Sequence, residues 1–183
     1  MIQMATLRQV QTPDLTRHEL ASIRSLCDAA YGGPDEPFSD EDWQHALGGV
    51  HIFIQDDGDV IAHGSVVPRT LHTGGLDLAT GYVEAVATSP PHQGRGHGTK
   101  IMRAVGAHID QAFPLGALCT GAPGFYRRLG WLLWEGPTSV RTSDGEDRYQ
   151  LEDGAVLVRL TPASPRLDPT APISCDWRPG DAW

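Results

Sequence analysis

The spacing of apolar residues along the chain alternates between helical and extended periods. Four apolar residues near the N-terminus fall on one helical face: Leu20, Ile23, Leu26 and Cys27. Thr16 and Glu19 have the spacing of a capping box, which begins a helix. This pattern predicts a helix over 16–30. A second, short helix is predicted from Ser39, which can cap it, to the glycine pair at 48–49.

The middle of the chain has the alternation and turn residues of antiparallel strands. Extended runs at 50–55 and 60–73 flank an Asp-Asp-Gly-Asp turn, and a Gly-Gly turn follows the second run. The remaining elements are predicted in this order: a strand over 78–89, a helix with Ile101, Met102, Val105, Ile109, Ala112 and Phe113 on its apolar face, a strand over 115–121, a short helix over 122–130, a strand over 131–136, an acidic turn region over 144–154, and a strand over 155–160.

The C-terminal segment 161–183 is rich in proline and has little periodicity. That composition is typical of a disordered terminus, yet the segment contains Trp177 and ends in Asp181-Ala182-Trp183. Because a solvated tail seldom contains tryptophan, we expect it to pack back onto the rest of the chain. Without repeats or a clear linker, residues 1–183 are predicted to form one domain.

Composition narrows the function classes. The 183 residues include 14 Lys+Arg and 23 Asp+Glu, a net charge of −9, which argues against a general nucleic-acid binder. The acidic balance suits a cationic substrate, although it also serves solubility. Eight His without a His-Glu-x-x-His motif and three widely spaced Cys predict no metal site and free thiols. With no long apolar run and no signal-peptide core, we expect a cytoplasmic protein without a membrane span.

The stretch HQGRGHGTK, residues 92–100, contains three glycines between a strand pattern and a helix pattern. A P-loop would need Gly-Lys-Ser/Thr in that order, and a Rossmann fingerprint would need Gly-x-Gly-x-x-Gly in an early βαβ unit; neither fits. Backbone N–H groups at a helix start can bind an anion, and glycines let the main chain approach its oxygens. The alternative is a glycine-rich turn without a ligand.

The order Gln93-x-x-Gly96-x-Gly98 resembles the Q/R-x-x-G-x-G/A signature of the GCN5-related N-acetyltransferases (GNATs). The resemblance implies an α+β fold: a mixed, mostly antiparallel sheet with splayed central parallel strands, flanked by helices. It implies acetyl-CoA as cosubstrate, with the pyrophosphate on the glycine loop and the pantetheine between strands 81–89 and 115–121. The implied cofactor-binding residues are Val86, Ala87, Gln93, Gly94, Arg95, Gly96, His97, Gly98 and Thr99.

Further stretches are similar to one GNAT branch, the aminoglycoside 2′-N-acetyltransferases: DWQHALGGVH (42–51), GYVEAVA (81–87), LGAL (115–118), FYRRLGWLLWEGPTSV (125–140) and CDWRPGDAW (175–183). This implies acetyl transfer to the 2′-amino group of an aminoglycoside, a resistance activity. Glu84, a carboxylate in an apolar strand pattern, is then the general base, acting through water. Tyr126 is the implied proton donor to the leaving thiolate, and the Val86 N–H is the implied oxyanion donor.

Substrate ammonium groups call for acidic partners. By motif match these are Asp42, Asp153, Asp181 and the terminal carboxylate of Trp183, with Glu84 and Cys119 lining the same site. The tail would then pack near the substrate. Pro37 replaces a family acid, for which Asp35 or Glu36 could substitute.

Three expectations from the sequence remain to be weighed. The resemblance implies a homodimer. The acceptor could be another amine, such as a cell-wall precursor, a polyamine or a peptide. A non-catalytic CoA-binding module is the remaining alternative, which the presence of both Glu84 and Tyr126 disfavours.

Overall fold

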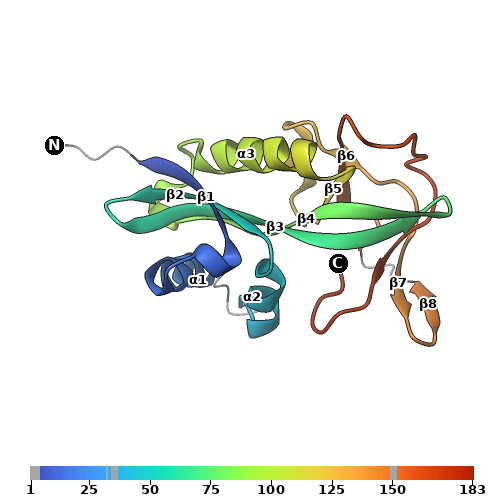
Figure 1. The fold of residues 1–183 in the computed structure, drawn as a ribbon, viewed down its shortest axis with the longest axis horizontal. Helices are drawn as coiled ribbons and strands as arrows, with labels where there is room; N and C mark the ends of the chain where they lie inside the picture. The colour runs from blue at the N-terminus through green and yellow to red at the C-terminus, as the bar shows by residue number, and fades with distance from the viewer. Residues whose placement is uncertain (1–4, 32, 34–36, 149–151) are drawn as a thin grey trace. The chain divides into compact units, whose positions relative to one another are not determined.

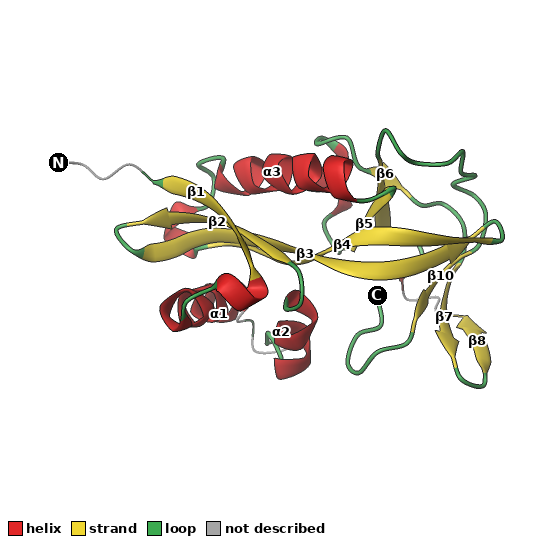
Figure 2. Ribbon diagram, in the orientation of Figure 1, coloured by secondary structure: helices red, strands yellow, loops and turns green. Residues whose placement is uncertain are grey.

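The structure is a computed structural model that describes residues 5–31, 33, 37–148 and 152–183. The chain forms two compact units: unit 1 contains residues up to 67 and 83–105, and unit 2 contains residues 68–82 and 106–183. Strands β3 (Asp59–Thr73) and β4 (Leu76–Thr88) contribute to both units. Figures 1 and 2 show the elements of each unit.

Unit 1 is a layer of antiparallel strands covered by helices. Strand β1 (Thr6–Gln11) pairs with β2 (Val50–Asp56), and β2 pairs with the first half of β3, both antiparallel. The helices of this unit are α1 (Arg17–Tyr31), α2 (Asp40–Ala46) and the beginning of α3 (His97–Ala112), with short 3₁₀ turns at Thr12–Asp14 and Pro90–His92. The predicted helix at 16–30 and the strands at 50–55 and 60–73 are confirmed.

The helices cover both faces of the unit 1 strands, as Figure 2 shows. On the α1 face, a buried cluster joins helix and strand residues: Leu15, Ile23, Leu26, Cys27, Phe53, Val60 and Ala87. On the α3 face, a Cβ added to Gly64 would lie 3.1 Å from a methyl of Ile101. A glycine at this position therefore lets helix and sheet pack closely.

Two capping boxes begin the helices on the α1 face. The Thr16 amide donates to the Glu19 carboxylate and the Glu19 amide donates to the Thr16 hydroxyl, which confirms the predicted cap. At α2, Ser39 accepts from the Asp42 amide, while the Asp42 carboxylate accepts from the Ser39 amide. The predicted cap at Ser39 is confirmed, with Asp42 as its partner.

Unit 2 is a mixed sheet. Its strands beyond β3 and β4 are β5 (Leu115–Cys119), β6 (Leu132–Leu133), β7 (Thr138–Thr142), β8 (Gly145–Arg148), β9 (Val156–Leu160) and β10 (Ile173–Asp176). Their order is β6-β9-β5-β4-β3-β10-β7-β8. Two pairs are parallel, β4 with β5 and β10 with β7. The pairs β10–β3, β5–β9, β6–β9 and β7–β8 are antiparallel. This is the predicted α+β class.

Several predicted boundaries in unit 2 were wrong. The strand predicted over 131–136 is only β6, because Trp131 and Trp134 are buried outside the strand and the Trp134 indole N–H donates to the Ala171 carbonyl at 2.8 Å. The helix predicted over 122–130 is α4 (Pro123–Arg127), which ends before Gly130 adopts φ +87°. The strand predicted over 115–121 ends at Cys119.

The C-terminal segment contains an unpredicted strand and packs onto unit 2. Strand β10 lies between β3 and β7, and Ile173 and Cys175 are fully buried. The terminal residues Ala182 and Trp183 are also buried. Strand β10 pairs with strands that are distant in the sequence. Its own short, proline-flanked pattern therefore did not predict a strand.

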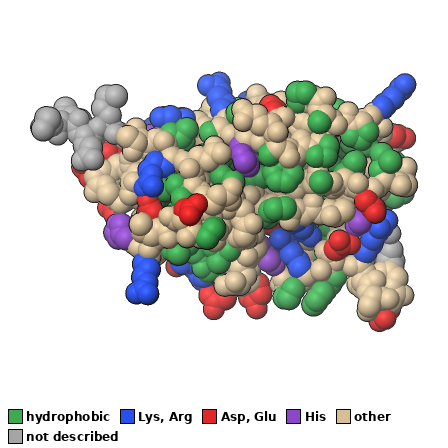
Figure 3. Space-filling model, viewed as in Figure 1, with side chains coloured by type: hydrophobic (Ala, Val, Ile, Leu, Met, Phe, Trp, Pro, Cys, Tyr) green, Lys and Arg blue, Asp and Glu red, His purple; other side chains and the backbone are tan. Residues whose placement is uncertain are grey.

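Charges on the face shown in Figure 3 are mixed: Lys and Arg side chains are scattered among Asp, Glu and uncharged side chains. In the described part of the chain, no helix has the length and apolarity needed to cross a membrane. The three cysteines are free thiols. No group of three or more metal-binding side chains comes together among the described residues.

Candidate active site

The glycine loop lies between the end of β4 and the beginning of α3, within unit 1. Gly94 and Gly96 have φ of +73° and +83°, which side chains rarely adopt, and a Cβ at either would meet no protein atom within 4 Å. The Gln93 side-chain amide donates to the Thr88 carbonyl at 3.1 Å and closes the loop against β4. The left-handed backbone, not a packing clash, therefore requires glycine here.

The loop exposes the N-terminus of α3. The Lys100 amide donates to the Gly96 carbonyl at 3.0 Å, which makes Gly96 the N-cap residue directly before α3. The amides of His97, Gly98 and Thr99 follow in the first turn, where backbone N–H groups have no partner within the helix. Arg95 is exposed beside them. The N-terminal dipole, the amides and Arg95 together favour an anion.

Strand β4 contains a left-handed residue just before this loop. Ala85 has φ of +50°, which is unfavourable for a residue with a Cβ. Such a residue interrupts an extended strand, so the alternation that placed Tyr82, Glu84 and Val86 on one face does not extend past Ala85. Strain of this kind clusters at functional sites when the surroundings hold it in place.

Glu84 and Val86 flank the strained residue. Glu84 is half-buried and its Oε1 atom is buried, while Val86 is half-buried and Ala87 is buried. The Val86 carbonyl accepts a hydrogen bond of 2.6 Å from the Tyr31 hydroxyl, at the end of α1. The predicted base, the predicted oxyanion donor and the glycine loop therefore lie along one continuous stretch of unit 1.

Tyr126 lies in α4 of unit 2 and is half-buried. Burial raises the pKa of its phenol to about 12, so the hydroxyl keeps its proton at neutral pH. The Phe125 ring packs edge-on against it at a centroid distance of 5.0 Å. The side chain is thus a hydrogen-bond donor in an apolar setting.

Two further predicted residues belong to unit 2, one at the end of β5 and one in the turn before β9. Cys119, at the end of β5, donates its thiol to the Glu152 carboxylate at 2.7 Å. The neighbouring Asp153 accepts from the Thr138 amide and hydroxyl, each at 3.0 Å. One oxygen of this exposed carboxylate thus fixes the beginning of β7.

The C-terminus of unit 2 is held by two arginines. The Arg69 guanidinium donates to the Ala182 carbonyl at 2.7 Å, and that of Arg178 donates to a terminal oxygen of Trp183 at 3.3 Å. The Trp183 amide donates to the exposed Asp181 carboxylate. Hydrogen bonds therefore anchor the backbone of Ala182 and Trp183 next to the predicted acid Asp181.

Asp42 belongs to unit 1, where one of its oxygens serves the cap of α2. Pro37 is exposed before this helix. The acids that could replace the one lost at Pro37, Asp35 and Glu36, lie outside the described residues. The cap occupies part of the hydrogen-bonding capacity of the Asp42 carboxylate. A substrate role for Asp42 remains a prediction.

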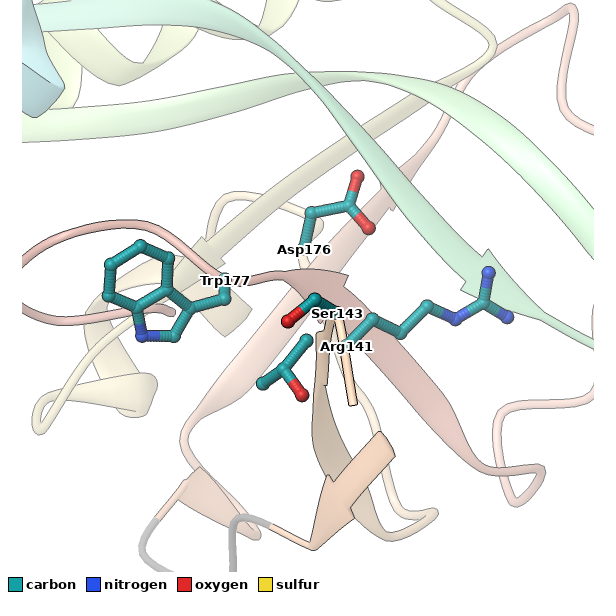
Figure 4. Close-up of a pocket in the computed structure, with 5 residues that line it drawn as sticks. Arg141, Ser143, Asp176 and Trp177 are labelled. Atoms are coloured by element: carbon teal, nitrogen blue, oxygen red, sulfur yellow. The ribbon is translucent and has the colours of Figure 1, made fainter. Parts of the chain in front are cut away.

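Unit 2 contains a pocket that the sequence did not indicate. Its volume is about 510 Å³ and its lining residues are Arg141, Thr142, Ser143, Asp176 and Trp177. Figure 4 shows the Trp177 ring and the Arg141 side chain extending in opposite directions, with Asp176 between them. Trp177 is 61% exposed, which is unusual for an aromatic residue of this size. The strand directly before Trp177, β10, was not predicted from the sequence either.

The sequence also gave no reason to single out His51 and His63. Both are fully buried, and His51 Nδ1 lies 2.9 Å from His63 Nε2. His63 Nδ1 lies 2.8 Å from the carbonyl oxygen of the strained Ala85. Histidines within the apolar strand runs 50–55 and 60–73 were the only available signal.

The fold and the glycine loop define an acetyltransferase, and comparison with known proteins agrees. Residues 12–133 match the family described as acetyltransferase (GNAT) domain. Over 182 residues, 97% of this chain and 92% of the relative, the sequence is 43% identical to an aminoglycoside 2′-N-acetyltransferase of Mycolicibacterium fortuitum. The chain therefore belongs to the GNAT acetyltransferases, in the same family as the M. fortuitum enzyme.

Solved structures support the fold. The GNAT family N-acetyltransferase YhbS of Escherichia coli, in complex with CoA, matches with a TM-score of 0.64 over 93% of this chain and 89% of that chain, at 17% identity. A GNAT family acetyltransferase of Brucella melitensis in complex with acetyl-CoA matches with a TM-score of 0.55 over 83% and 95%, at 19% identity. At these identities the likeness concerns the fold alone.

Proposed function

We propose that this protein transfers the acetyl group of acetyl-CoA to the 2′-amino group of an aminoglycoside, and so confers resistance to such drugs. One observation carries the proposal: 43% identity over 97% of the chain to an aminoglycoside 2′-N-acetyltransferase. A match of this length extends well beyond the residues proposed to bind acetyl-CoA.

The reaction requires a neutral nucleophile. An amine is mostly protonated near pH 7, so its proton must first pass to a base. Glu84 takes this role, through a water molecule. The amine nitrogen then attacks the thioester carbonyl carbon, a C–N bond forms, and the C–S bond breaks as the CoA thiolate leaves.

Two donors stabilise the negative charge that develops. The Val86 N–H stabilises the carbonyl oxygen, which becomes an oxyanion in the tetrahedral intermediate. The Tyr126 phenol stabilises the leaving CoA thiolate. Because burial raises the pKa of Tyr126 to about 12, well above the roughly 8.5 of a free thiol, this phenol stabilises the thiolate by hydrogen bonding more readily than by giving up its proton. No covalent acyl-enzyme on Cys119 is required.

Acetyl-CoA fits the glycine loop. The open space above Gly94 and Gly96 leaves room for pyrophosphate oxygens against the main chain. The amides of His97, Gly98 and Thr99 would donate to those oxygens. Bound there, the cosubstrate supplies the activated acetyl group. The reaction as written uses no metal.

Acidic side chains would bind the ammonium groups of the drug. The candidates are Asp42 and Glu84 of unit 1, and Cys119, Asp153, Asp181 and the carboxylate of Trp183 of unit 2. The net charge of −9 favours approach of a polycation. We further propose a cytoplasmic homodimer that has no nucleic-acid or membrane partner.

A matched pair of aminoglycosides tests the proposal. One compound carries a 2′-amino group and the other a 2′-hydroxyl, with the remaining amines alike, and release of the CoA thiol from acetyl-CoA is measured. We expect turnover only with the first compound. Equal turnover with both would exclude 2′ transfer. Turnover with neither, but with another amine such as a polyamine, would replace the proposed acceptor.

A further inference from the structure

A chain of hydrogen bonds crosses the buried interior of unit 1 and ends at the strained residue of β4. The Thr12 hydroxyl lies 2.9 Å from His51 Nε2, His51 Nδ1 lies 2.9 Å from His63 Nε2, and His63 Nδ1 lies 2.8 Å from the Ala85 carbonyl oxygen. Both histidines are fully buried. The groups come from four separate segments of the sequence: successive members are 39, 12 and 22 positions apart. They meet through folding alone.

The direction of every hydrogen bond in the chain follows from its last group, the Ala85 carbonyl. A carbonyl oxygen only accepts, so His63 donates from Nδ1 to Ala85. Its Nε2 must then accept in a neutral ring, so His51 donates from Nδ1 and its Nε2 carries no proton. The Thr12 hydroxyl lies 2.9 Å from His51 Nε2 and 3.0 Å from the Gly49 carbonyl oxygen, which already accepts from the Thr12 amide. In this arrangement the single hydroxyl proton of Thr12 goes to His51 Nε2. Burial lowers the pKa of His51 to about 4 and that of His63 to about 3, so both rings are neutral near pH 7.

The strained segment is held by side chains at three successive carbonyls. Besides the His63 bond to Ala85, the Ser65 hydroxyl donates to the Glu84 carbonyl at 3.3 Å and the Tyr31 hydroxyl donates to the Val86 carbonyl at 2.6 Å. An alanine at φ +50° persists only when its surroundings favour that conformation over the extended one. Of the three bonds, the one to Ala85 acts on the left-handed residue itself.

We propose that His63 and His51 are positioning residues for acetyl transfer, because their hydrogen-bonded chain fixes the Ala85 peptide and thereby aims the Glu84 carboxylate and the Val86 amide. The proposal rests on the proposed function, in which those two groups act on the amine and on the oxyanion. A backbone displacement of about 1 Å at reacting groups can lower a rate a hundredfold. Loss of the chain should therefore affect turnover more than cofactor binding, which occurs at the loop from Gln93 to Thr99.

Two substitutions of His63 separate positioning from packing. His63→Phe keeps a ring but removes the donor to Ala85, whereas His63→Asn places an amide N–H near the position of Nδ1. We expect kcat to fall by about ten- to a hundredfold in His63→Phe with KM for acetyl-CoA unchanged, and to recover to within about threefold of the unmodified protein in His63→Asn. Ile109→Ala, a truncation of a fully buried residue of α3 outside the hydrogen-bonded chain, is the control that loses stability without losing kcat.

Equal kcat values in the two variants would contradict the proposal. If His63→Phe and Ile109→Ala lose stability alike and both retain kcat, the histidines are packing residues only. Should His63→Phe fail to fold, nitrogen chemical shifts of ¹⁵N-histidine in the unmodified protein still decide. Protons on Nδ1 of both rings support the chain, and a proton on Nε2 of His63 in a neutral ring overturns it.

The test also distinguishes failure of this inference from failure of the proposed function. The kcat comparison is made with whichever amine the unmodified protein acetylates. If that amine is not a 2′-amino sugar, the proposed acceptor fails while the His63 comparison keeps its meaning. If Glu84→Gln retains full turnover, the proposed base fails, and a fall in His63→Phe would then be assigned to the Val86 amide.

Discussion

The glycine loop and the Ala85 bulge (residues 84–86, around the left-handed Ala85) both contain left-handed backbone within unit 1, but they obtain it in different ways. Gly94 and Gly96 adopt positive φ because glycine lacks a Cβ, and open space lies above them. Ala85 adopts φ +50° with a Cβ, while side chains distant in sequence bind its carbonyl and those of its neighbours. The loop is thus encoded locally and the bulge by the fold.

This difference matches the two tasks proposed for these segments. Cofactor binding needs backbone amides that a ligand can approach, which a few glycines provide. Chemistry needs a carboxylate and an amide fixed to within a fraction of an ångström, which a rigid, over-determined strand provides. The loop should therefore govern affinity for acetyl-CoA, and the bulge should govern turnover.

The largest expected effect concerns the bulge. Glu84→Gln removes the base while keeping the size of the side chain, and general-base catalysis is commonly worth about 10²- to 10⁴-fold. We expect kcat with the accepted amine to fall by about that factor at neutral pH. Steady-state release of the CoA thiol measures it. Raising the pH, which deprotonates free amine, should recover part of the rate; unchanged turnover at pH 7 would remove Glu84 from the mechanism.

The next effect concerns the loop, with a matched control. Gly96→Ala places a methyl group where the pyrophosphate would lie, and we expect at least about a tenfold loss of CoA affinity, equal to 1.4 kcal/mol. Gly58→Ala introduces similar strain, at φ +92° in the β2–β3 turn, with equally open space. Both variants should lose about 1 kcal/mol of stability, but calorimetric titration should show weaker CoA binding only for Gly96→Ala. Equal CoA affinities in the two variants would mean that the pyrophosphate does not bind at this loop.

A third prediction uses the pH dependence of stability. His51 and His63 have folded pKa values of about 4 and 3, below the ordinary 6.5. Above pH 6.5 both states hold these rings neutral, so stability is unaffected. As the pH falls from 6.5 toward 4, the unfolded chain binds protons that the folded chain does not, so the free energy of unfolding falls, by up to about 1.4 kcal/mol per pH unit for each ring.

Urea unfolding at several pH values between 4.5 and 7 checks this. His63→Asn should reduce the slope by about one ring's contribution. An unaltered slope in His63→Asn would show that the buried pair does not stay neutral.

The smallest expected effect comes from placing a glycine at the left-handed position of the bulge. Ala85→Gly removes the Cβ penalty of about 1–2 kcal/mol but adds roughly 0.5–1 kcal/mol of backbone entropy in the unfolded chain. We expect stability to change by less than about 1 kcal/mol, with a gain more favoured than a loss, and kcat to fall by a few-fold because the bulge becomes less rigid. Thermal unfolding and steady-state kinetics measure both. A strong loss of stability would contradict the strained assignment of Ala85.

The sequence predicted what local patterns encode. The caps at Thr16 and Ser39, the strands that lead to β4 and the glycine loop before α3 follow from spacing and turn residues, and the structure confirms them. Family resemblance added roles for Glu84 and Tyr126, which remain predictions.

What the sequence did not predict depends on contacts between distant segments. Strand β10 forms because β3 and β7 accept a short segment that alone has no clear strand pattern. The conformation of Ala85 depends on His63, 22 positions earlier. Alternation along β4 predicted a regular strand, since nothing local marks an alanine as left-handed.

The central claim is that the bulge performs chemistry while the loop binds the cofactor, and calorimetric titration of acetyl-CoA into Glu84→Gln tests it most directly. The substitution lies on β4, only a few residues before the loop. We predict a dissociation constant within about twofold of the unmodified protein, alongside the loss of turnover. Acetyl-CoA affinity that falls in parallel with turnover would contradict the division of tasks between the two segments.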